Sequence, residues 1–220
     1  MNQMVKIYLV RHAEAQGNVE EFFQGHIDTD VSEKGRKQLE CLAERFKDIP
    51  IEEVYTSPLR RARATAEAVN KYHRLPLTVD PHIIEIYAGD WEGVRWSELP
   101  EKFPHEYELW SKQINKFKAP HGESTRQVYD RMKLAMRNIA AENNGKTIAV
   151  ISHGMAIKAY LNYADGREWE NYVDPGWSDN TAVSLIEYDD ELMPHIIFKN
   201  DSSHLKDGLS TLAVSKWCKK

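Results

Sequence analysis

The chain has 220 residues, enough for one domain with a sizeable core but too few for a second full-sized domain. Its 41% hydrophobic and 29% charged residues give it the composition of an ordinary soluble globular protein. The net charge of -5 and the scattered basic residues argue against nucleic-acid binding, so any anion must be held by a local site.

The first half of the chain alternates strand-like and helix-like segments. The continuous apolar run "VKIYLV" at 5–10 predicts a strand that is buried on both faces. Apolar residues at helical spacing predict a helix over 32–49, with Ser32 as its N-cap. A second short strand is predicted at 52–57, and a helix at 58–72 has Pro58 near its first turn.

The second half continues this alternation. A single apolar stripe predicts a helix over 125–143, a buried strand follows at 147–152, and another helix covers 153–164. Segments 181–189 and 194–200 are typical of a closing pair of strands. Together the elements predict an α/β fold: a three-layer α/β/α sandwich, doubly wound, with a mostly parallel sheet and an antiparallel edge strand. Because no repeat or linker divides the chain, residues 1–220 are expected to form a single domain.

Polar residues follow three of the predicted strands. Arg11 and His12 come after the first strand, Arg60 and Arg61 after the second, and His153–Gly154 after the third. Open α/β sheets bind ligands beyond the carboxyl ends of their strands. The sequence therefore predicts a site at this edge of the sheet.

Four short motifs occur in order along the chain: "LVRHAE" at 9–14, "TSPLRRARATA" at 56–66, "EIYAGDWEG" at 85–93 and "ISHG" at 151–154. Together they resemble the histidine phosphatase superfamily, the clan of the cofactor-dependent phosphoglycerate mutases and their phosphatase relatives. The resemblance extends from about Lys6 to about Leu205. Ala13 stands where the family usually has glycine, and alanine is compatible with any negative φ.

The chemistry of phosphate monoesters explains this choice of residues. Their negative oxygens repel a nucleophile and must be neutralised before attack. Arginine matches these oxygens with a planar fork, and Arg11 together with Arg60 or Arg61 suits that role. The family pattern, in which the arginine directly precedes an alanine, favours Arg61. The resemblance also selects His12 as the nucleophile that carries the phosphoryl group, and His153 as a hydrogen-bond donor, ideally as the imidazolium.

The leaving alkoxide needs a proton, which a carboxylic acid in apolar surroundings can supply. Glu85, which is flanked by isoleucines, is the predicted general acid. Glu14 and Glu92 are weaker candidates for carboxylates that orient histidines or begin helices. The other histidines, His26 among them, have no metal-ligand spacing and are expected on the surface or in loops. The sequence thus predicts neither a metal site nor a cofactor.

Substrate-binding residues are implied by the family pattern. The matching asparagine and the "QG" turn reach the same anion in the family, which indicates Asn18, Gln24 and Gly25, and Gly154 beside His153 joins them. The triplet "GES" at 122–124 matches a further family motif. Its serine could equally serve only to cap the following helix.

An aromatic-rich segment at about 87–121 is expected to form an insertion that covers the site and selects the leaving group. The motif "EIYAGDWEG" lacks the tyrosine-glycine-leucine pattern typical of the mutases. It therefore indicates a phosphomonoesterase of the histidine acid phosphatase type that acts, without a metal, on a small phosphorylated metabolite.

Three alternatives remain. A cofactor-dependent phosphoglycerate mutase would show stable labelling by 2,3-bisphosphoglycerate with little hydrolysis. A catalytically silent binding module is disfavoured by the intact set of candidate catalytic residues. A metal-dependent hydrolase would lose its activity in a chelator.

Two features bear on location. Cys41 and Cys218 lack a disulfide-framework spacing, which favours a reducing compartment. The N-terminal segment lacks the pattern of a signal peptide, and no apolar run approaches membrane-spanning length. We therefore expect a cytoplasmic protein whose partner is a small phosphorylated substrate, not a nucleic acid or a membrane. The sequence does not predict the oligomeric state.

Overall fold

The computed structural model describes residues 4–206 and 208–213, so Cys218 lies outside the described residues. The strands are β1 Val5–Arg11, β2 Glu53–Thr56, β3 Leu77–Val79, β4 Thr147–Ser152, β5 Val183–Tyr188 and β6 Pro194–Asp201. The α-helices are α1 Gln16–Val19, α2 Glu33–Phe46, α3 Arg60–Val69, α4 Leu99–Lys102, α5 Pro104–Lys112, α6 Thr125–Glu142 and α7 Gly154–Ala164. Short 3-10 turns are η1 Pro81–Ile83, η2 Gly89–Trp91, η3 Ile114–Lys116 and η4 Trp169–Asn171.

Every strand and helix predicted from the sequence is present, with bounds that differ by a few residues. The polar residues predicted to begin helices do so: Ser32 Oγ accepts the Gly35 N–H at the start of α2 (2.9 Å). Ser124 forms a capping box with Gln127 at the start of α6. Strand β3 was not predicted, because its three residues are too few to show a period, and Pro76 just before it is tolerated only at a sheet edge.

The six strands form one mixed sheet in the order β3-β2-β4-β1-β5-β6. Strands β1, β2, β3 and β4 run parallel, and β5 runs antiparallel to both β1 and β6. The predicted fold class is confirmed, with one correction: the antiparallel strand is β5, one place in from the edge. Its side chains are almost all buried, whereas β6 after Pro194 consists of partly buried and exposed residues, so the more buried strand takes the inner position.

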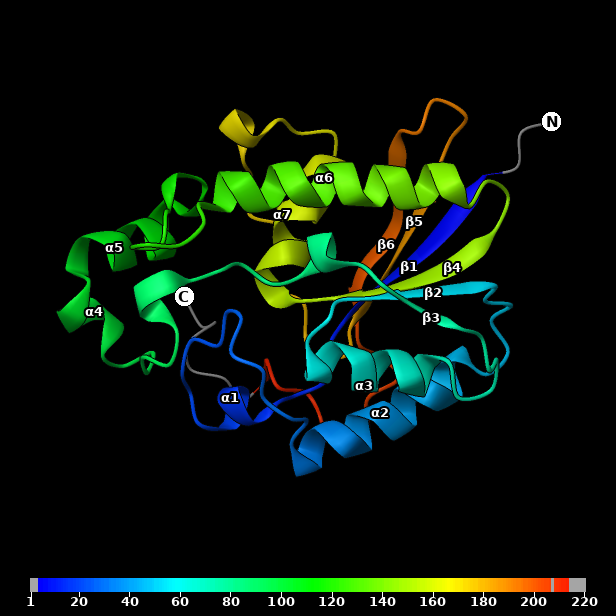
Figure 1. The fold of residues 1–220 in the computed structure, drawn as a ribbon, viewed down its shortest axis with the longest axis horizontal. Coiled ribbons are helices and arrows are strands. Elements are labelled where there is room, and N and C mark those ends of the chain that lie inside the picture. The colour runs from blue at the N-terminus through cyan, green and yellow to red at the C-terminus, as the bar shows by residue number, and fades with distance from the viewer. Residues whose placement is uncertain (1–3, 207, 214–220) are drawn as a thin grey trace.

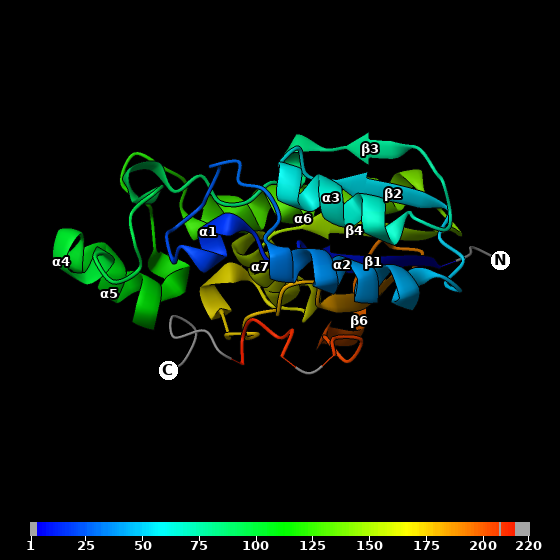
Figure 2. The same cartoon turned by 90° about the horizontal axis from the view of Figure 1, so that it is seen from below.

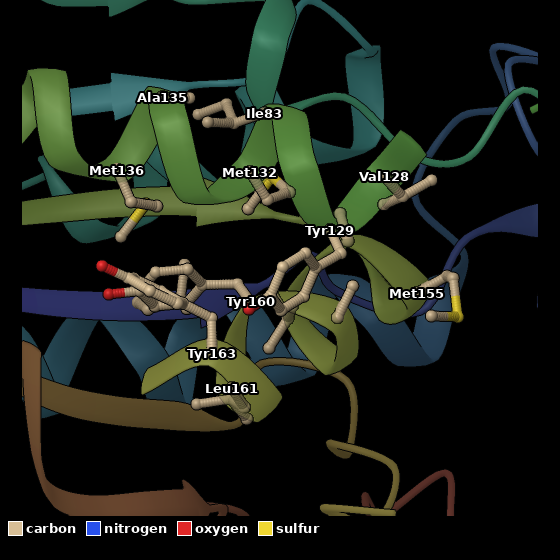
Figure 3. Close-up of a cluster of buried hydrophobic side chains, with 14 of the residues drawn as sticks. Ile83, Val128, Tyr129, Met132, Ala135, Met136, Met155, Tyr160, Leu161 and Tyr163 are labelled. Atoms are coloured by element: carbon tan, nitrogen blue, oxygen red, sulfur yellow. The ribbon is translucent and has the colours of Figure 1, made fainter. Parts of the chain in front are cut away.

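Helices cover both faces of the sheet. Figures 1 and 2 show α6 and α7 on one face and α2 and α3 on the other. Alternate residues of β1 follow this division: Ile7 and Leu9 pack in the cluster with α6 and α7, and Val10 packs in the cluster with α2 and α3. Figure 3 shows Met132 and Met136 of α6 above Tyr160 of α7 in the first cluster. Each such side chain contributes roughly 1.5–3 kcal/mol through burial.

The sheet brings three predicted strand ends together. Strand β4 pairs with β1 and β2 on its two sides, and Arg11 lies opposite Ser152 while Thr56 lies opposite Ile151. The segments that follow β1, β2 and β4 therefore leave the sheet side by side at its carboxyl edge.

Candidate active site

Arg11 and His12 are held at the end of β1 by contacts from both sides. The His12 N–H donates to the Ser152 carbonyl at the end of β4 (3.0 Å), and the Thr181 N–H donates to the Arg11 carbonyl (3.1 Å). The side-chain amide of Asn180 donates to the His12 carbonyl (2.9 Å). The backbone that carries both side chains is thus fixed before any ligand binds.

The His12 imidazole is oriented by its own loop. Its Nδ1 lies 2.7 Å from the Ala13 carbonyl oxygen, so Nδ1 carries the proton and Nε2 carries the lone pair. Burial lowers the pKa of His12 well below its usual value, and the Arg61 and Arg11 cations lower it further. The imidazole is therefore neutral at neutral pH. Ala13 is not among the residues with a positive φ, which explains why alanine is accommodated there.

Arg61 is a buried cation on the first turn of α3. Its Nη1 donates to the Ile27 carbonyl (2.7 Å) and its Nη2 to the Gly25 carbonyl (2.8 Å). Its Nε is buried and has no hydrogen-bond partner within residues 4–206 and 208–213. Burial lowers the pKa of Arg61 to about 10, so the guanidinium stays charged at neutral pH. Arg60, in contrast, is exposed and pairs with Asp28 and Asp30.

His153 is the N-cap of α7 and has no exposed surface. Its Nε2 lies 2.7 Å from Ser57 Oγ, and its ring centroid lies 5.1 Å from that of His12. Burial, followed by the Arg61 cation, lowers the pKa of His153 well below its usual value. This corrects the imidazolium expected from the sequence: the surroundings of His153 favour the neutral ring.

Glu85 lies between η1 and η2, against the start of α7. Its Oε1 accepts the N–H groups of Ile86 (2.9 Å) and Ala156 (3.1 Å), and its Oε2 accepts that of Met155 (3.2 Å). These hydrogen bonds place the carboxylate next to the turn that carries His153.

The loop after β1 supplies three more predicted residues. Asn18 Oδ1 accepts the Ala15 N–H (3.0 Å), and Gln24 Oε1 accepts the Thr29 hydroxyl (2.6 Å). Gly25 has a φ of +49°, and a Cβ there would lie 2.2 Å from Glu92 Oε1. A side chain at position 25 is thus disfavoured both by the positive φ of the backbone and by a steric clash with Glu92.

One pocket joins these groups. Its polar lining consists of Arg11, His12, Asn18, Gln24, Gly25, Arg61, Glu85 and Gly154. Its remaining wall is apolar and consists of Phe22, Phe23, Trp96, Trp110, Met155 and Trp177. His153 is the one predicted site residue that is not among the residues lining the pocket; its ring lies next to that of His12.

The aromatic segment contributes both core and pocket wall. The Trp110 ring on α5 lies 4.9–6.1 Å from the rings of Phe23, Trp91, Trp96, Phe117 and Trp177. Trp91 and Phe117 are fully buried, whereas Trp96 and Trp110 line the pocket. In Figure 1, α4 and α5 project from one end of the molecule.

Glu14 and Glu92 organise loops. Glu14 accepts the Ser32 hydroxyl (2.7 Å), and Glu92 accepts the N–H groups of His26 (2.8 Å) and Ala88 (3.1 Å). Neither carboxylate is hydrogen-bonded to the ring of His12 or His153, so their weak assignment as histidine-orienting groups is wrong.

Within the described residues, no group of three or more His, Cys, Asp or Glu side chains is arranged to hold a metal ion. No described helix is both long and apolar enough to cross a membrane.

Sequence reasoning missed Ser57 and Asn180 as supports of the two histidines. Ser57 stands within the quoted motif "TSP", directly after β2. Asn180 precedes β5, and the start of an antiparallel strand beside β1 lies at the same edge as the end of β1. Knowing which strand pairs with β1 would have been enough to place Asn180 near the site.

The two buried histidines should make the stability of the fold depend on pH. As the pH falls through about 6.5 the unfolded chain protonates both, whereas the folded protein keeps them neutral. Below this pH the unfolded state binds more protons than the folded state, so the free energy of unfolding decreases as the pH is lowered. From pH 6.5 to about 5.5, each histidine should remove about 1 kcal/mol of stability. Chemical denaturation measures this loss of unfolding free energy between pH 6.5 and about 5.5. The loss should be about 1 kcal/mol smaller in His153→Gln than in the wild type. The same pH dependence in both proteins would contradict the assignment.

Comparison with known proteins gives four findings. The model of the histidine phosphatase superfamily (branch 1) matches residues 7–201. Phosphoserine phosphatase 1 of Hydrogenobacter thermophilus is 32% identical over 206 residues, which cover 92% of this chain and 95% of that protein. The metal-independent phosphoserine phosphatase of Arabidopsis thaliana is 34% identical over 162 residues, which cover 72% of this chain and 68% of that protein. Among solved structures, Bacillus stearothermophilus YhfR has a TM-score of 0.86 and 29% identity, covering 92% of this chain and 100% of that chain.

Proposed function

The chain belongs to the histidine phosphatase superfamily and is a phosphatase, and we propose that it hydrolyses a small phosphomonoester through a phosphohistidine on His12. The family, the fold and the phosphatase function predicted from the sequence are thereby confirmed. One observation carries the proposal for the site: the neutral, oriented imidazole of His12 shares one pocket with Arg11, Arg61 and Glu85.

Binding begins with the two arginines. The phosphoryl oxygens accept hydrogen bonds from the Arg11 and Arg61 guanidinium groups. These cations neutralise the negative charge that would otherwise repel a nucleophile. The buried Nε of Arg61 supports this role, because an unpaired buried donor costs about 1–3 kcal/mol until it meets an acceptor. The side-chain amides of Asn18 and Gln24 contact the same anion, which their position in the lining of the pocket supports.

Two phosphoryl transfers complete the reaction. The lone pair on His12 Nε2 attacks phosphorus, the ester P–O bond breaks, and the departing oxygen takes a proton from Glu85. Water then attacks the phosphohistidine and gives a proton to the Glu85 carboxylate, the P–N bond breaks, and inorganic phosphate leaves. His12 Nδ1 keeps its proton throughout and donates it in a hydrogen bond to the Ala13 carbonyl, which preserves the tautomer.

His153 acts as a hydrogen-bond donor in this scheme. Ser57 holds its Nε2, and its buried Nδ1 has no partner within the described residues. The proposed donor is therefore Nδ1–H, toward a phosphoryl oxygen. A dianion close to the ring would oppose the lowering of the His153 pKa that burial and the Arg61 cation cause.

The substrate class follows from the pocket. A phosphoryl clamp beside an apolar, tryptophan-rich wall suits a small metabolite whose leaving group contacts the aromatic rings. Two of the relatives named above are phosphoserine phosphatases, so O-phosphoserine should be included in the substrate panel. A hydrolysis screen across phosphorylated metabolites, with His12→Ala as the control, identifies the substrate.

Three further statements complete the proposal. The enzyme is of the histidine acid phosphatase type. It needs no metal ion, which the name of the Arabidopsis relative supports. The aromatic segment at about 87–121 covers the site and selects the leaving group, which the position of Trp96 and Trp110 supports. The protein acts in the cytoplasm, in keeping with cysteines that have no disulfide-framework spacing.

Glu85→Gln tests the acid assignment. Alkyl phosphates expel a poor leaving group that needs a proton, whereas p-nitrophenyl phosphate expels a stable phenolate. The variant should therefore slow alkyl phosphates by about 10²–10⁴-fold and the nitrophenyl ester much less. Single-turnover rates on both esters measure this difference. Equal losses on the two esters would show that Glu85 does not act as the general acid.

A further inference from the structure

The "GES" triplet at 122–124 contributes a buried contact as well as a helix cap. While Ser124 caps α6, the carboxylate of Glu123 pairs with Arg131, a partly buried residue of that helix. Arg131 Nε donates to Glu123 Oε1 (2.9 Å), and Nη2 donates to Glu123 Oε2 (3.2 Å). Both side chains are partly buried, at 17% and 22% exposure, so this ion pair is partly shielded from solvent.

The rest of the Arg131 guanidinium holds the backbone around Glu85. Nη1 donates to the carbonyls of His82 (2.8 Å) and Ile84 (2.7 Å), and Nη2 donates to the carbonyl of Glu85 itself (2.9 Å). Together with the two bonds to Glu123, these use all five N–H donors of the arginine. No lysine could reproduce this pattern.

Glu123 holds the other side of Glu85. Its Oε2 accepts the Tyr87 N–H (2.8 Å), and its own N–H donates to the Tyr87 carbonyl (2.8 Å). The segment between η1 and η2 has no regular secondary structure, so its backbone groups depend on such partners. The Arg131–Glu123 pair therefore anchors the chain on both sides of residue 85.

We propose that Arg131 and Glu123 are positioning residues for the general acid. This inference rests on the proposed role of Glu85. Proton transfer requires the carboxyl oxygen within about 2.6–3.2 Å of the leaving oxygen, and small displacements of a reacting group reduce rates strongly. The ion pair touches neither phosphate nor leaving group; it acts through the backbone that carries Glu85.

The test compares two esters in Arg131→Gln and Glu123→Gln. Misplacement of the acid should slow single-turnover hydrolysis of an alkyl phosphate by roughly 10–100-fold and that of p-nitrophenyl phosphate by no more than about threefold. Arg126→Gln is the matched control, because Arg126 lies on the same helix, is exposed, and pairs at the surface with Asp130 and Glu170. It should leave both rates unchanged.

A double-mutant cycle separates positioning from ordinary stabilisation. In a Glu85→Gln background, Arg131→Gln should cause no further selective loss on the alkyl ester, since no proton donor remains to be placed. Equal losses on both esters, or a selective loss that persists in this background, would overturn the inference. If Arg131→Gln does not fold, Arg131→Lys and Glu123→Gln give the same comparison.

The two proposals fail in different ways. If Glu85→Gln is itself unselective, the acid assignment falls and the positioning role falls with it. If Glu85→Gln is selective while Arg131→Gln and Glu123→Gln are not, only the positioning role is lost.

Discussion

His12→Ala should lower the turnover of an alkyl phosphate by roughly 10⁴–10⁶-fold while the protein still folds, because removing a nucleophile leaves only binding and electrostatic stabilisation. The fold should survive, since the contacts of Asn180 and Ser152 with residue 12 involve its backbone. Turnover and thermal unfolding measured on the same preparation check both statements.

His195→Ala is the matched control for this experiment. His195 is exposed on β6 and pairs with Asp189, far along the sheet from the pocket-lining residues. Its removal should leave turnover unchanged. A His12→Ala enzyme that retains more than about a tenth of the wild-type rate would rule out His12 as the nucleophile.

Arg61→Lys should lower turnover by about 10²–10³-fold, whereas Arg60→Lys should stay within about threefold of the wild type. A lysine ammonium is a point charge and cannot hold the Ile27 and Gly25 carbonyls while also presenting a fork to the phosphate. Arg60 meets the surface carboxylates of Asp28 and Asp30 and the Asp28 carbonyl, where a lysine serves almost as well. Steady-state kinetics on one ester measures both variants. Equal, small effects would mean that Arg61 does not clamp the phosphate.

The main catalytic candidates could be predicted because the topology of an α/β sheet is visible in the sequence. Three apolar strands end near candidate residues: one on Arg11, one just before the segment that carries Arg61, and one just before His153. If these strands are parallel neighbours, their carboxyl ends lie at one edge of the sheet, and in the structure β2, β4 and β1 are adjacent and parallel. The choice of Arg61 over Arg60 came from the family motif. The geometry gives this choice a physical basis, because the Arg61 side chain lines the pocket whereas the Arg60 side chain is exposed to solvent.

Features that depend on tertiary distance could not be predicted. The neutral state of His153 follows from complete burial beside Arg61, and no sequence pattern reports either quantity. The contacts of Asn180 with His12, and of Arg131 with Glu85, join residues far apart in the chain. The inner place of β5 likewise depends on how a strand pair docks against β1.

The most direct test of the central claim is to trap the phosphoryl-enzyme. Wild-type protein mixed with a ³²P-labelled alkyl phosphate and quenched rapidly in base should carry the label on the peptide that contains "VRHAEAQGN". The label should be stable in base and lost in acid, as a phosphohistidine is, and it should be absent from His12→Ala. A label on serine, threonine or an acidic residue would contradict the account.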